Sequence, residues 1–295
     1  MDNSEKAIVR TLLYSDIFDY PLSDDEVWKF LISNKNIDKK LFENKIKKIN
    51  SIVFRKDGFL HMEDKSSVVS KRIISFRESK IKINLAYKTI EKLFIIPTVV
   101  FIGISGNLSM MNAGRKDDID LFVITTKNTV WITRLLLIVY LKILGKHRKR
   151  SDKDVADKFC LNMIIDEDKL LLSKNLRSLY TAHEIVQLMP IMQRGDIYKK
   201  FIDSNKWVKS YMPNIIEEIS GQKIAIPRKS ILENFLRVVI KFPFFESAAR
   251  ILQVNVMKRN ITREIIEDKF IALHPKDYKN IILARYEEKI SRYGL

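Results

Sequence analysis

A short central segment constrains the fold most, because it combines a glycine turn with two closely spaced acids. One apolar run ends at Ser105, Gly106 and Asn107. Asp118 and Asp120 follow within a second apolar run. Residues two apart on a strand share a face, so the two carboxylates should point the same way, roughly 6 to 7 Å apart. At that separation they repel by roughly 2 to 3 kcal/mol at an effective dielectric of 20.

These groups suit a site for a divalent cation and a phosphate. Mg²⁺ (or Mn²⁺) prefers oxygen ligands and commonly takes one or two carboxylates together with phosphates, which would relieve the repulsion. Gly106 lets the backbone approach a ligand closely. A short helix expected over residues 108–113 would direct its first N–H groups at an anion. The alternative interpretation is a β-turn-β connection with two acids facing solvent.

The same residues resemble the motif of the DNA polymerase beta-type nucleotidyltransferases. That motif is an apolar residue, then Gly-Ser or Gly-Gly, then about ten residues, then Asp-x-Asp between apolar residues. The specific likeness covers about residues 98–125, and the matching positions are Gly106, Asn107, Asp118 and Asp120. A looser likeness, to uncharacterised bacterial and archaeal nucleotidyltransferase-domain proteins, extends over most of the chain and implies no particular substrate.

The resemblance implies transfer of a nucleoside monophosphate from a nucleoside triphosphate to an unknown acceptor. Asp118 and Asp120 would be the catalytic residues and would hold Mg²⁺ (or Mn²⁺). A second set of residues would bind the nucleotide, most of them through its phosphates: Ser105, Gly106, Asn107, Arg115, Lys116 and Asn162.

The sequence departs from the family motif at two positions. Asn107 stands where serine or glycine is usual. The family's third carboxylate lies on a later strand, and the polar residue of the best candidate strand, residues 159–165, is Asn162. An asparagine coordinates cations but cannot accept a proton from a hydroxyl nucleophile. A second interpretation therefore stays open: a non-catalytic nucleotide- or DNA-binding regulatory protein that retains the fold.

The pattern of the whole chain predicts an α+β protein of three domains. Residues 1–70 should form a winged-helix-like domain, because three helical patterns precede a hairpin that turns at Asp57 and Gly58. Residues 71–174 should form the central mixed-sheet nucleotidyltransferase domain, and residues 175–295 a helical domain. On one of these later helices, a polar cluster is positioned to contact a nucleotide base or sugar, or to form a buried hydrogen-bonded group: Tyr180, His183 and Glu184.

The charge and hydropathy of the chain limit which partners and which cellular location we expect. The 53 Lys and Arg residues exceed the 36 Asp and Glu residues, giving a net charge of +17. This surplus favours polyanionic partners, so nucleic acid is a further candidate beside the nucleotide. The basic residues are spread along the chain and include a basic third helix and a basic loop over residues 146–153. The alternative interpretation is that they only solvate the surface. In the most apolar segment, residues 130–144, charges interrupt the apolar run well short of the 18 or so residues of a membrane span. We therefore expect no membrane span and a cytoplasmic protein.

Overall fold

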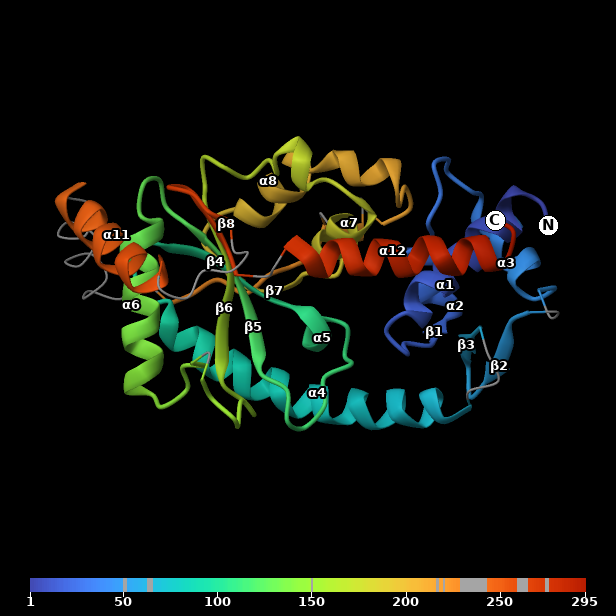
Figure 1. Ribbon diagram of the computed structural model, residues 1–295, viewed down its shortest axis with the longest axis horizontal. Helices are drawn as coiled ribbons and strands as arrows, with labels where there is room; N and C mark the ends of the chain where they lie inside the picture. Colours follow the sequence, from blue (N-terminus) through green and yellow to red (C-terminus); the bar gives the residue numbers. More distant parts are fainter. Residues whose placement is uncertain are drawn as a thin grey trace.

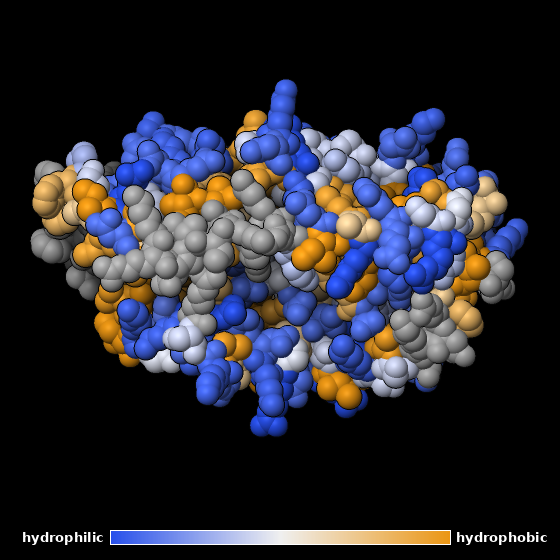
Figure 2. All heavy atoms as spheres, viewed as in Figure 1, coloured by the Kyte–Doolittle hydropathy of each residue, from blue (hydrophilic) through white to orange (hydrophobic). Residues whose placement is uncertain are grey.

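The computed structural model describes residues 1–49, 52–62, 66–149, 151–215, 218–219, 221–228, 243–258, 265–273 and 276–295. Within these residues the protein is α+β and contains two separate β-sheets. The molecule is elongated, with a small N-terminal part at one end and a larger sheet at the other (Figure 1). Hydrophilic side chains cover much of the face shown in Figure 2, in keeping with the net charge of +17.

The N-terminal part consists of three helices and a small sheet. The helices are α1 (Asn3–Asp16), α2 (Asp24–Lys29) and α3 (Lys39–Ile46), and the antiparallel strands β1 (Leu22–Ser23), β3 (Phe59–His61) and β2 (Phe54–Lys56) lie in that order. Capping boxes begin the first two helices, with Asp2 at the N-cap of α1 and Ser23 at that of α2. The three helices and the hairpin turn predicted from the sequence are therefore confirmed.

Helix α4 (Ser66–Leu93) connects the two ends of the molecule (Figure 1). Its 28 residues span about 42 Å at 1.5 Å per residue. Two of its cations, Arg72 and Lys82, are buried. Each is paired with a carboxylate, Glu26 and Asp157 respectively, which offsets the cost of burying the charge.

The larger sheet has six strands in the order β7-β4-β5-β6-β9-β8. Strands β5 and β6 are parallel and are connected through helix α6 (Val130–Ile143), whereas all the other neighbouring strands in this sheet are antiparallel. The strands are β4 (Val99–Ser105), β5 (Ile119–Thr125), β6 (Phe159–Asp166), β7 (Met189–Gln193), β8 (Ile265–Ile266) and β9 (Phe270–Ala272).

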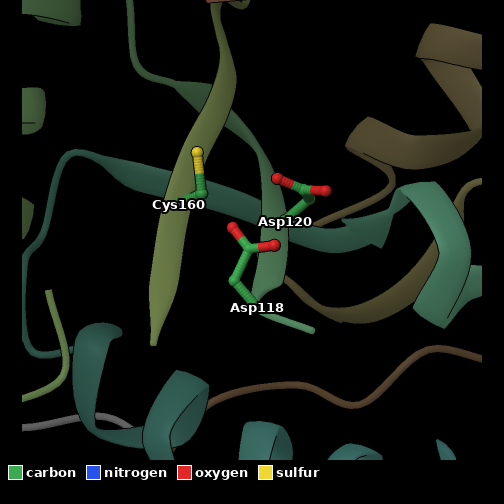
Figure 3. A group of neighbouring side chains, drawn as sticks. All are labelled: Asp118, Asp120 and Cys160. Carbon is green, nitrogen blue, oxygen red and sulfur yellow. The ribbon is translucent and has the colours of Figure 1, made fainter. Parts of the chain in front are cut away.

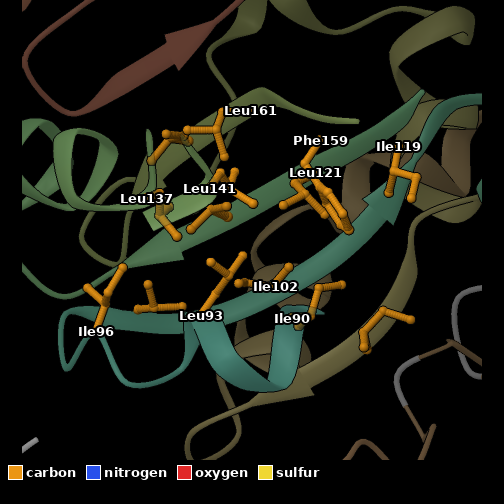
Figure 4. Close-up of a cluster of buried hydrophobic side chains, with 14 of the residues drawn as sticks. Ile90, Leu93, Ile96, Ile102, Ile119, Leu121, Leu137, Leu141, Phe159 and Leu161 are labelled. Carbon is orange, nitrogen blue, oxygen red and sulfur yellow. The ribbon is translucent and has the colours of Figure 1, made fainter. Parts of the chain in front are cut away.

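Helices cover both faces of this sheet. Leu121 (Figure 4) and Val123 belong to the core shared with α4 and α6. Helix α11 (Pro243–Lys258) packs on α6. Phe122 and Ile124 point the other way, toward α7 (Leu179–Val186) and α8 (Ile197–Ser204). Alternation along a buried strand thus supplies both cores. Asp120 lies on the second face, at the end of the strand where the apolar covering stops.

The structure differs from the sequence expectations in two places. The short helix after the glycine turn, α5 (Gly106–Ser109), begins at the glycine itself rather than at residue 108. The segment after residue 175 is not purely helical, because β7, β8 and β9 complete the larger sheet. Its last helix, α12 (Lys276–Arg292), packs on α1 of the N-terminal part.

None of the described helices is long and apolar enough to cross a membrane.

Candidate functional site

The two aspartates of the motif lie side by side at the start of β5. Asp118 immediately precedes the strand and Asp120 is its second residue, so both side chains project from one face (Figure 3). Cys160 of the parallel strand β6 lies opposite Asp120 in the register. One ligand atom from each of these three residues lies within 4.8 Å of the other two. The expected pairing of the two carboxylates is present in the structure.

The glycine turn packs directly against this pair. Gly106 has a φ of +67°, which favours glycine, and Ser105 pairs with Asp120 across the β4–β5 ladder. A Cβ atom on Gly106 would lie 2.8 Å from Oδ2 of Asp120. Only a residue without a side chain therefore allows the backbone of the turn to approach the carboxylate this closely.

Arg148 is a basic partner of the acid pair that the sequence did not single out. Its Nη1 donates to Oδ2 of Asp118 at 2.6 Å. The loop after α6 reaches the site because His147 bridges to Phe159 at the start of β6. The sequence signal was a run of basic residues at 146–153, which did not indicate which of them reaches the aspartates.

Burial and mutual repulsion shape the protonation of the site. Burial, and then the charge of Asp118, raise the pKa of Asp120 to about 7, and Arg148 opposes that rise. Burial and the nearby Asp120 raise the pKa of the Cys160 thiol to about 12. The thiol is therefore protonated at neutral pH, and the available ligands are carboxylate oxygens. That donor set fits Mg²⁺ or Mn²⁺ better than a thiolate-seeking metal.

A cavity of about 350 Å³ opens above the acid pair. Its lining includes Asp118, Asp120, Gly106 and Asn107, which together are called the floor below. Its walls come from parts of the chain that are far apart in sequence: α1 and the segment after it, helix α7, and Tyr278 of α12. Ligand pockets commonly lie between packed elements in this way. The polar cluster predicted near residue 180 lines this cavity with all three members, Tyr180, His183 and Glu184.

Four of the predicted nucleotide-binding residues do not line the cavity: Ser105, Asn162, Arg115 and Lys116. Asn162 is buried, and its Nδ2 donates to Oγ of Ser105 at 3.1 Å in a smaller space behind the acids. The register of β5 and β6 shifts there: Leu121 faces Leu161 but Phe122 faces Met163, which leaves Asn162 in a bulge. Cys160, not Asn162, is therefore the neighbour of Asp120.

Arg115 and Lys116 are the other two. Both are exposed, on the loop that leads into β5, and neither lines the cavity. The loop is held by a turn in which Asp117 accepts from the N–H of Gly114.

The positive charge of the basic third helix, α3, is also partly neutralised, because Lys45 pairs with Asp2 and Glu5.

Comparison with known proteins adds no identification. No protein-family model matches the chain, and no curated protein or solved structure matches it significantly.

Proposed function

We propose that the protein is a Mg²⁺-dependent nucleotidyltransferase that moves a nucleoside monophosphate from a nucleoside triphosphate to an acceptor. One observation carries this proposal. A glycine turn with a left-handed glycine lies against a same-face pair of aspartates, and both form the floor of a cavity of about 350 Å³. Close backbone approach beside paired carboxylates is typical of phosphoryl-transfer sites.

Each residue of the floor has a role in this proposal. Asp118 and Asp120 hold the cation, which when bound neutralises charge on the phosphates. Gly106 and Asn107 position the phosphates with the backbone of the turn. Arg148 is within reach of the same place, since it already contacts Asp118, and its guanidinium neutralises charge that develops on the transferred group.

A second candidate function is supported by Cys160. The resemblance leads us to expect a third carboxylate on the strand beside Asp120, and the residue facing Asp120 is this cysteine. A protonated thiol is a poor proton acceptor at neutral pH. The other carboxylates lining the cavity, apart from the pair, are Asp117 and Glu184. If neither accepts the proton, the protein binds Mg²⁺ and nucleotide without turnover, as a regulatory protein.

A binding and turnover experiment distinguishes these functions. Nucleoside triphosphate labelled at the α-phosphate is incubated with Mg²⁺, RNA and protein acceptors, and both bound label and label transferred to an acceptor are measured. We expect Asp118→Asn and Asp120→Asn each to lower Mg²⁺-dependent binding by at least tenfold, or about 1.4 kcal/mol. Asp203→Asn, at an exposed ion pair on α8, is the matched control and should bind normally.

The outcomes separate cleanly. Transfer of label that both acid variants abolish supports the enzyme. Tight Mg²⁺-dependent binding without any transfer supports the regulatory protein. Nucleotide affinity that is unchanged in both acid variants contradicts both functions, because each requires the acid pair to hold the cation.

A further inference from the structure

Aromatic rings form much of the lining of the cavity. Six of them come from four separate segments of the chain: Tyr14, Phe18, Tyr20, Phe30, Tyr180 and Tyr278. Flat, apolar walls of this kind suit a planar ring, because nucleobases stack on aromatic side chains.

His183 provides a polar group in this aromatic wall. Its side chain lines the cavity but is only 4% exposed, and its ring stacks on that of Tyr14 with centroids 3.9 Å apart and an interplanar angle of 7°. Burial lowers the pKa of His183 to about 3, so the ring is neutral at physiological pH. A neutral imidazole carries one N–H donor and one acceptor nitrogen.

The hydrogen bond of the first ring nitrogen identifies the second as the donor. The amide Nε2 of Gln187, a donor, lies 3.2 Å from Nδ1 of His183, so Nδ1 accepts and the proton is on Nε2. That Nε2–H is buried, and among the described residues it has no hydrogen-bond partner. A buried donor left without an acceptor destabilises the folded protein. An acceptor atom supplied by a ligand removes this destabilisation.

We infer that this aromatic lining binds the nucleobase of the nucleotide, with the His183 Nε2–H donating to a ring nitrogen or a carbonyl oxygen of the base. This inference rests on the proposed function, because it assumes that the phosphates occupy the floor. The Tyr14 ring fixes the plane of the imidazole, and therefore the direction of the hydrogen bond.

The test compares nucleotides with a ligand that has phosphates but no base. Dissociation constants are measured by calorimetry in Mg²⁺ for ATP, GTP, CTP, UTP and inorganic tripolyphosphate. At least one nucleotide should bind at least tenfold more tightly than tripolyphosphate. The variant His183→Phe keeps a ring against Tyr14 but lacks the donor. It should reduce this margin, the ratio of nucleotide affinity to tripolyphosphate affinity, severalfold without changing the affinity for tripolyphosphate.

A second variant keeps the inference testable if His183→Phe does not fold. Tyr278→Ala changes an exposed tyrosine of α12 that lines the cavity and should also reduce the margin. Tyr87→Ala, a similarly exposed tyrosine on α4 outside the cavity, should leave it unchanged.

Different results would refute the inference and the proposed function. If no nucleotide binds more tightly than tripolyphosphate, or if both cavity variants weaken all ligands equally, the nucleobase site is refuted while the phosphate site stands. If neither nucleotide nor tripolyphosphate binds in a Mg²⁺-dependent manner, the proposed function fails, and the inference with it.

Discussion

At the scale of single residues, the carboxyl of Asp120 lies where its charged form is disfavoured. Its pKa is raised to about 7, against an ordinary value near 4, so the folded state holds a proton that the unfolded state releases. This contribution to stability is complete below about pH 4 and is lost as the pH rises through 7. Without divalent cations, the free energy of unfolding should fall by a few kcal/mol across that interval because of this residue.

Urea denaturation in EDTA at pH 5 and pH 8 measures this effect. Asp120→Asn, which cannot ionise, should lose less stability than the wild type between the two pH values. Asp203→Asn, at the exposed α8 site, should follow the wild type. Parallel curves for wild type and Asp120→Asn would show that the carboxyl titrates normally.

Cys160 offers a direct way to strengthen the site. Cys160→Asp places a third carboxylate opposite Asp120, and oxygen ligands are those that Mg²⁺ prefers. We expect Mg²⁺ or Mn²⁺ affinity to rise at least tenfold, measured by calorimetry at pH 8, and any nucleotidyl transfer to increase. Cys160→Ser, which adds no charge, is the control. Equal cation affinity in both variants would show that residue 160 does not face the cation.

Arg148 competes with a cation for Asp118. Because its guanidinium lies 2.6 Å from the carboxylate, Arg148→Gln should raise the affinity for Mg²⁺ alone severalfold. The same change should lower the affinity for Mg²⁺–nucleotide, since a positive charge near the phosphates is lost. Arg148→Lys keeps the charge and should give intermediate values. A variant in which both affinities change in the same direction would contradict this dual role.

The sequence revealed only part of this site. Asp118, Asp120 and Gly106 were predictable because spacing along one strand and one turn determines their geometry. Cys160 was not, because its position depends on the pairing register of two strands about 40 residues apart, and the bulge at Asn162 alters that register. The position of Arg148 near Asp118 depends on how the loop after α6 folds back onto β6, which its sequence does not indicate.

At the scale of elements, helix α6 is capped by a residue from far along the chain. The carboxylate of Glu246, in α11, accepts from the backbone N–H groups of Trp131 and Ile132, both at 2.9 Å. The local N-cap residue, Thr129, makes no capping hydrogen bond from its side chain to the helix. An acid at a helix N-terminus is favoured by the helix dipole as well as by the hydrogen bonds.

Replacing this cap should destabilise the packing of α11 on α6. We expect Glu246→Ala to cost about 1–2 kcal/mol in the free energy of unfolding, measured by urea denaturation. Hydrogen exchange at Trp131 and Ile132 should also become faster. Glu288→Gln, at an exposed site on α12, is the control and should have little effect. Unchanged exchange at both amides would show that the cap is not formed in solution.

The elements that the sequence failed to predict are the short strands. β7 contains Pro190, which cannot donate to a ladder and is tolerated here because β7 is the edge strand. β8 and β9 have two and three residues, too few for a period of two to be recognised. The strand predicted over residues 159–165 agrees with β6 to within one residue, because its apolar pattern is long.

At the scale of the whole molecule, Arg72 links the N-terminal part to the glycine turn. From α4 it donates to the carbonyls of Met110 and Met111 at 2.8 and 2.9 Å, and to Glu26 of α2 at 2.7 Å. Its guanidinium also lies 4.0 Å from the ring centre of Tyr20. One buried cation therefore holds the turn, α2 and α4 together.

Arg72→Met should separate these contacts and leave Glu26 without its partner. We expect a loss of about 3 kcal/mol or more in stability, measured by urea denaturation. Mg²⁺-dependent nucleotide affinity should fall as well, because the carbonyls that Arg72 binds follow directly after the turn. Arg77→Met, at an exposed position on the same helix, is the matched control. An Arg72→Met protein as stable as the control would refute the linking role.

The cavity wall that α1 and α12 share has a consequence for biosynthesis. Tyr14 of α1 and Tyr278 of α12 line the same space, yet about 260 residues separate the two helices. At 5–20 residues per second, a ribosome takes about 10 to 50 s to make the intervening chain. Throughout that time the residues of α1 have been synthesised and those of α12 have not. A translation product interrupted before α12 therefore lacks one wall of the cavity.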